Sequence, residues 1–143
     1  MKDLLYADIT YKIRGAAFMV WKKFGGAFKE KIVDNALTIA LEKKGLKVKN
    51  QSRIDIFFEN EKVGNYTPDK IVDELVLLEL KCKPFLTPGD RKQFWYYLRA
   101  SKYKVGLLIN FGVNKLEIER KIYDTARSKI PHKSASLSAF SSK

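Results

Sequence analysis

The segment that most constrains the fold is LVLLELKC, residues 75–82, which has the composition of a buried β-strand. Its apolar run is interrupted by Glu79 and Lys81, two positions apart. Residues two apart on a strand point to the same face, so Leu78 and Leu80 point to the other. One face is therefore apolar, while the other carries a carboxylate beside an ammonium group. Taken alone, this pattern favours an exposed sheet face with an ion pair worth about 0–1 kcal/mol.

Helical periodicity appears in three other stretches. Apolar residues recur at helical spacing over residues 5–24 and 28–44, which predicts two amphipathic helices. A third helix is expected within residues 85–103, with Thr87 as its N-cap and Asp90 at the third helical position, in place of the usual capping-box Glu or Gln.

The remaining segments have strand character. Short β-forming runs separated by turn residues predict an antiparallel meander through the middle of the chain, then a buried strand, then a short strand or helix. These segments are 46–51, 54–58, 61–66, 69–72 and 75–81 for the meander, 104–111 for the buried strand and 114–126 for the last element.

The element order ααβββ(β)αβ predicts an α/β fold, with a central mixed β-sheet flanked by helices. One domain is expected over residues 1–126, followed by a basic, Ser- and Lys-rich tail over residues 127–143 that is expected to be flexible.

The charge of the chain favours a polyanionic partner. Lys and Arg number 28 against 16 Asp and Glu, giving a formal net charge of +12, and 45% of the residues are hydrophobic, enough for a real core. Nucleic acid is the first candidate partner and an anionic membrane surface is the second, although many basic domains are simply soluble.

The metal-binding residues available are limited. Cys82 is the one cysteine and His132 the one histidine, so an internal disulfide, a CxxC metal site and a histidine-based zinc centre are all excluded. A bound metal would need oxygen ligands, which favours Mg²⁺ or Mn²⁺. We recognise no signal peptide and no apolar run of about 18 residues, so a cytoplasmic protein without a membrane span is expected.

Asp69 precedes the 75–81 strand by one predicted hairpin with its turn at Asp73-Glu74. A two-residue loop would pair Asp69 with Leu78, on the wrong face, whereas a three-residue loop or a bulge would pair it with Glu79. We predict the second register. Two adjacent carboxylates repel, and a divalent cation would offset that cost.

Two further polar residues lie where helices could approach this strand. Glu30 precedes Val33 and Leu37 on the second helix, so it falls on the apolar stripe rather than the solvent side, although a first-turn glutamate is also favoured by the helix dipole. Gln93 lies one turn from Tyr96 and Tyr97 on the third helix, where the sequence favours an ordinary polar residue on an aromatic-rich helix unless that helix packs beside the site.

Asp69 after Pro68, followed by Glu79-Leu80-Lys81, resembles the motif of PD-(D/E)XK nucleases, which have a restriction-endonuclease-like core. More closely, residues from about 10 to 116 resemble the GxxExxY proteins of that superfamily. Glu30 matches the glutamate of the GxxExxY motif. Ala27 and Val33 replace its glycine and tyrosine, and Asp90 replaces the histidine usual early in the third helix.

This resemblance implies metal-dependent hydrolysis of phosphodiester bonds by a nuclease. Asp69, Glu79 and the Leu80 carbonyl would hold Mg²⁺, with Mn²⁺ possible, and Glu30 would add a direct or water-mediated ligand.

The other implied roles belong to groups around the metal. Lys81 would orient the attacking water or stabilise charge in the transition state, and Gln93 resembles a helix glutamine that steadies the site in some relatives. Trp95 and Tyr96 are candidates for base stacking, although core packing is the commoner role. Basic residues that would contact the phosphate backbone are Lys70, Lys83, Arg91, Lys92, Arg99 and Lys102.

Three functions therefore remain open. The first is a Mg²⁺-dependent nuclease that acts on nucleic acid, with DNA favoured and a homodimer possible. The second is a nucleic-acid-binding module with the same fold and little activity, which the residues at positions 27 and 33 favour slightly. The third is an accessory protein whose charge serves a protein or membrane partner.

Overall fold

The computed structural model describes residues 5–26 and 28–123. The predicted tail over residues 127–143 and the boundary at residue 126 lie outside this range. Among the described residues, no helix is both long and apolar enough to cross a membrane. The helices are α1 (Ala7–Phe24), α2 (Glu30–Lys43) and α3 (Pro88–Ala100), and the strands are β1 (Val48–Asn50), β2 (Ile54–Phe58), β3 (Glu61–Tyr66), β4 (Lys70–Val72), β5 (Val76–Lys81), β6 (Val105–Phe111) and β7 (Leu116–Ile122).

The described residues form one mixed sheet and one separate hairpin. The main sheet has the strand order β1-β4-β5-β6-β7, in which β5 and β6 are parallel and the other neighbours are antiparallel. This arrangement confirms the predicted α/β class with a central mixed sheet. Helix α3 connects the two parallel strands, as a crossover between parallel neighbours requires.

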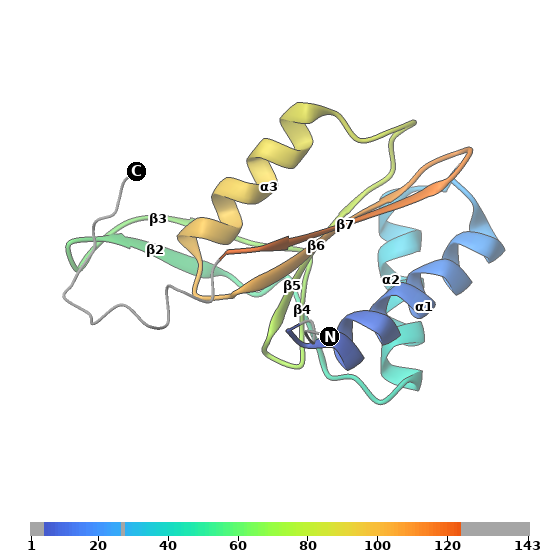
Figure 1. The fold of residues 1–143 in the computed structure, drawn as a ribbon, viewed down its shortest axis with the longest axis horizontal. Coiled ribbons are helices and arrows are strands. Elements are labelled where there is room, and N and C mark those ends of the chain that lie inside the picture. Colours follow the sequence, from blue (N-terminus) through green and yellow to red (C-terminus); the bar gives the residue numbers. More distant parts are fainter. Residues whose placement is uncertain (1–4, 27, 124–143) are drawn as a thin grey trace.

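The predicted antiparallel meander is wrong in one respect. Strand β1 pairs with β4, and within the described part of the chain the β2–β3 hairpin pairs only with itself and extends away from the main sheet (Figure 1). Most side chains of β2 and β3 are exposed, whereas β4 is buried throughout, so the hairpin has too little apolar surface for the middle of a covered sheet. The ambiguous last segment is a strand, β7.

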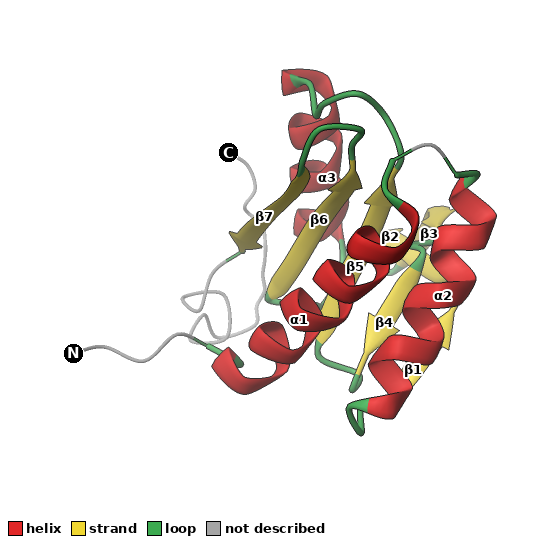
Figure 2. Ribbon diagram, turned by 90° about the vertical axis from the view of Figure 1, so that its right-hand side faces the viewer, coloured by secondary structure: helices red, strands yellow, loops and turns green. Residues whose placement is uncertain are grey.

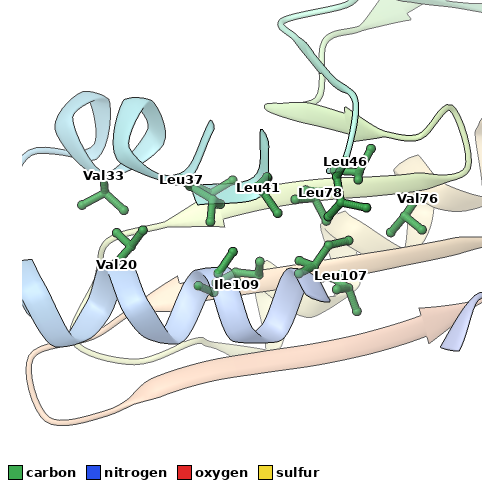
Figure 3. Packing of buried hydrophobic residues seen from close by; sticks show 14 of the residues in the cluster. Val20, Val33, Leu37, Leu41, Leu46, Val76, Leu78, Leu107 and Ile109 are labelled. Carbon is green, nitrogen blue, oxygen red and sulfur yellow. The ribbon is translucent and has the colours of Figure 1, made fainter. Parts of the chain in front are cut away.

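Helices cover both faces of the sheet. Helices α1 and α2 pack on one face, and α3 lies on the other (Figure 2). Between α1, α2 and the sheet lies the main core, to which β5 contributes Val76, Leu78 and Leu80 (Figure 3). The intervening Leu77 packs instead with Phe94 of α3, so the alternation along β5 places Glu79 and Lys81 on the α3 side.

The N-terminus of α3 carries the predicted capping box. Thr87 Oγ1 accepts a hydrogen bond from the Asp90 amide at 3.1 Å, and the Thr87 amide donates to Asp90 Oδ2 at 2.9 Å. These reciprocal bonds satisfy backbone donors that the first helical turn leaves open.

Candidate active site

The turn between β4 and β5 sets which side chains face each other. Val72 pairs with Val76, which leaves a three-residue loop, and Lys70 pairs with Leu78. Asp73 and Glu74 both have positive φ, at 50° and 58°, as in the tight turns of right-twisted hairpins, and the next residue is the extra one that shifts the register. Continuing this register by one residue places Asp69 opposite Glu79, as the sequence predicted.

Asp69 lies beside β5 where β4 has not yet begun. Its Oδ2 accepts a hydrogen bond of 2.7 Å from the Leu80 amide. Burial raises the pKa of the Asp69 carboxyl, and this hydrogen bond works in the opposite direction. Because the N–H and C=O groups of one strand residue point to the same edge, the Leu80 carbonyl also points toward this end of β4. A carboxylate and a backbone carbonyl therefore converge at one corner of the sheet.

Glu79 is held by a residue that the sequence analysis missed. Tyr66, at the end of β3, donates its hydroxyl to Glu79 Oε1 at 2.6 Å. The Tyr66 ring stacks on Tyr97 of α3, with 3.7 Å between ring centroids and 7° between planes. The pKa of Glu79 is raised to about 7, mainly by burial of the carboxyl and to a smaller extent by the negative charge of Asp69.

Glu30 is the first residue of α2 and is exposed at the rim of this corner, so the prediction that it lies on the buried side of the helix rather than the solvent side is wrong. The start of α2 and the end of β5 lie at the same end of the sheet (Figure 2). Burial raises the pKa of Glu30, the nearby charge of Asp69 raises it further, and the ammonium group of Lys81 lowers it. Asp69 and Lys81 thus act electrostatically on both Glu30 and Glu79.

The arrangement fits a hard divalent cation with few protein ligands. Over residues 5–26 and 28–123, no three His, Cys, Asp or Glu side chains converge closely enough to hold an ion together. Mg²⁺, however, is commonly held by one or two carboxylates, and water completes its octahedron. Asp69, Glu79 and the Leu80 carbonyl are oxygen donors of this type and could hold such an ion, and Glu30 could take part only through water.

Lys70 cannot contact phosphate as the sequence analysis expected. Its side chain has 0% relative exposure, and its ammonium group is bound by the Asp34 carboxylate, by Thr38 Oγ1 at 2.8 Å and by Asn50 Oδ1 at 2.8 Å. On β4 it points to the α2 side, opposite to Asp69.

The other predicted basic residues are nearer the surface, but two are already paired. Lys83 Nζ lies 2.6 Å from Asp90 Oδ2, and Arg91 Nε donates to Glu119 Oε2 at 2.5 Å. Burial alone would raise the pKa of Asp90, but the hydrogen bonds from Lys83 and Thr87 outweigh it and lower the value to about 2. These pairs order the loop before α3 and join α3 to β7.

Lys92, Arg99 and Lys102 each lie over an aromatic ring. The cation-to-centroid distances are 5.9 Å over Tyr96, 5.8 Å over Tyr123 and 5.6 Å over Tyr103, respectively. The two lysines are exposed, so they remain available to a phosphate backbone.

The remaining predicted side chains lie along α3. Gln93 is exposed and lines a shallow pocket with Lys92, Tyr96 and Tyr97, and Tyr97 in turn stacks on Tyr66, the residue that binds Glu79. Trp95 packs edge-on against Tyr123, with ring centroids 5.4 Å apart, which indicates a packing role.

A corner of a mixed sheet with Asp69, Glu79 and Lys81 around one end of β5 has the residue types of a metal-dependent phosphodiester hydrolase. The PD-(D/E)XK nuclease superfamily matches residues 7–121, which include every one of these side chains, and the chain belongs to that superfamily. No curated protein and no solved structure shows a significant match to the chain. The narrower resemblance to GxxExxY proteins stays a prediction.

The raised pKa of Glu79 predicts a pH dependence of stability in the metal-free protein. The pKa of Glu79 is about 7 in the folded protein, against an ordinary 4.5, so the folded state favours the protonated carboxyl. The resulting contribution to stability is fully present below about pH 4.5 and is lost as the pH rises through about 7. With a chelator present, we expect the free energy of unfolding to be about 2 kcal/mol lower at about pH 8 than at about pH 5. Denaturant titrations of wild type and Glu79→Gln test this, because the variant should show a much smaller difference. Equal differences in the two proteins would contradict the assignment.

Proposed function

We propose that this protein is a Mg²⁺-dependent nuclease that hydrolyses phosphodiester bonds in DNA. The observation that carries the proposal is the β4–β5 register, in which Lys70 pairs with Leu78; extended by one residue, it puts Asp69 level with Glu79 on the face that carries Lys81. A bound divalent ion would polarise the scissile phosphate and lower the pKa of a water molecule. Asp69, Glu79 and the Leu80 carbonyl would hold that ion, with Glu30 acting through water.

The protein's own residues would orient the reacting groups. Tyr66 fixes the Glu79 carboxylate, and the Leu80 amide fixes that of Asp69, so neither side chain must reorganise when substrate arrives. Lys81 extends from the same face as Glu79 and would stabilise the negative charge that develops on the phosphate. Position 33 matters little to this chemistry, because Val33 is buried between α1 and α2.

Replacing Lys81 tests the proposal against a binding module without activity. We expect Lys81→Gln to reduce the rate of Mg²⁺-dependent DNA cleavage by about 10²–10³-fold, because one group that stabilises transition-state charge is lost. The readout is conversion of labelled DNA over time with Mg²⁺, with Mn²⁺ and with chelator.

Lys12→Gln is the matched control, since it removes the same charge from the exposed surface of α1 and should cleave like wild type. If wild type binds DNA and neither Mg²⁺ nor Mn²⁺ supports cleavage, the protein is a binding module. If Lys81→Gln cleaves as fast as Lys12→Gln, Lys81 has no catalytic role.

A further inference from the structure

A second concave surface lies on the same face of the sheet as the proposed active site. It is a cleft of about 650 Å³ between the beginning of the β2–β3 hairpin and the end of α3, and Ile71 of β4 lies on its floor. Ile71 and Asp69 are two residues apart, so they share a face of the sheet. Ile54, on the hairpin side of the cleft, is the cross-strand partner of Tyr66, which binds Glu79. The cleft therefore begins about 5 Å, one cross-strand pair, from the Tyr66 backbone.

The lining of the cleft is basic. Lys49, Arg53 and Lys102 contribute three positive charges, against the single carboxylate of Asp55. Asp55 is itself shared by Arg53, at 3.5 Å, and by Lys62, at 3.2 Å. These are solvent-exposed ion pairs, which contribute little, so a phosphate group could compete for the same cations.

One wall of the cleft also offers an aromatic surface. Phe57 of β2 lines the cleft and is 59% exposed. An exposed aromatic ring beside a row of cations is the combination by which proteins bind single-stranded nucleic acid, since bases stack on the ring while cations follow the backbone. The cleft has the volume of a small-molecule pocket, so it can accommodate a few nucleotides of one strand but not enclose a duplex.

We propose that this cleft binds a single-stranded segment of the nucleic-acid substrate beside the proposed cleavage site, with Arg53 and Lys102 on the backbone and Phe57 against a base. The inference rests on the proposed function for the identity of the ligand. It makes the β2–β3 hairpin a substrate-binding element as well as the support of Glu79.

Charge removal inside and outside the cleft tests this inference. Binding of a labelled single-stranded oligodeoxynucleotide by the full chain is measured by fluorescence anisotropy in chelator, so that no cleavage occurs. For Arg53→Gln/Lys102→Gln we expect the affinity to fall about tenfold. We also expect the plot of log K against log salt to become less steep by about 1.4, because two phosphate contacts worth about 0.7 each are lost. Lys22→Gln/Lys23→Gln removes the same charge from the last turn of α1, on the opposite face, and should bind like wild type.

Phe57→Ala tests the stacking contact separately. We expect it to weaken binding of the single strand about tenfold, with little effect on a blunt duplex of the same sequence. Phe18→Ala is the control, because Phe18 is 50% exposed on α1. Equal affinities of the cleft variants and their controls, or equal losses for single strand and duplex, would overturn the inference.

The two proposals fail in different ways. If the cleft variants lose single-strand binding while wild type with Mg²⁺ cuts no nucleic acid, the binding site stands and the nuclease proposal falls. If wild type cuts but the cleft variants bind like their controls, the nuclease proposal stands and the cleft is not the binding site.

Discussion

Asp69→Asn is expected to reduce DNA cleavage by about 10³-fold without destabilising the protein. Asparagine keeps the size of the side chain and an oxygen that can still accept the hydrogen bond from the Leu80 amide. It lacks the charge that a divalent cation needs, so the loss should appear in cleavage rather than in folding. The measurement is the single-turnover cleavage rate, together with the midpoint of thermal unfolding in chelator.

The same substitution should make the metal-free protein slightly more stable. Burial is the larger cause of the raised pKa of both Glu79 and Glu30, and the charge of Asp69 raises both further, so Asp69 repels each of these carboxylates in the folded state. Removing one charge relieves that repulsion, so a higher unfolding temperature should accompany the lost activity, as is common at active sites. Glu42→Gln, the same change on the exposed surface of α2, should alter neither property. Full activity of Asp69→Asn would remove Asp69 from the mechanism.

The geometric relations predicted correctly from sequence are those that local rules determine. The period of two along a strand places Glu79 and Lys81 on one face, and the number of residues in the hairpin loop determines whether Asp69 joins them. The Thr87 capping box likewise depends only on residues three apart. Each of these relations holds within a short segment, so no knowledge of the tertiary packing was needed.

Tyr66 could not be found by such rules. Its contact with Glu79 depends on where the end of β3 lies relative to β5 in space, and no sequence periodicity relates the β2–β3 hairpin to β5. The predicted meander was wrong for the same reason. It assumed that strands adjacent in sequence are also adjacent in the sheet, whereas β1 pairs with β4.

Lys70, by contrast, carried a signal that the sequence analysis did not use. On β4 it alternates with Asp69 and Ile71 and pairs with Leu78, so it belongs to the apolar face. A lysine in such a position must be buried with an acceptor. Asp34, one helical turn after Glu30 on α2, is that acceptor.

Lys70→Met is expected to destabilise the protein by about 3–5 kcal/mol, because it leaves the buried carboxylate of Asp34 without its cation. Asp34 is 8% exposed, and Thr38 Oγ1 and Asn50 Oδ1 also bind the lysine, so the substitution removes the centre of a network that joins α2, β1 and β4. Urea titration at neutral pH measures the loss. An effect below about 1 kcal/mol would show that water or a rearranged side chain replaces the ammonium group.

The double variant Lys70→Met/Asp34→Leu separates stability from positioning. With neither charge present, most of the lost stability should return, because apolar residues of similar size often replace a buried ion pair at little cost. Glu30 lies four residues before Asp34, and Asp69 adjoins Lys70, so the pair also ties together the two elements that carry these carboxylates. We therefore expect the double variant to fold but to cleave DNA up to about 10²-fold more slowly, as a displacement of about 1 Å can cause. Wild-type cleavage rates in a fully folded double variant would show that the ion pair serves folding alone.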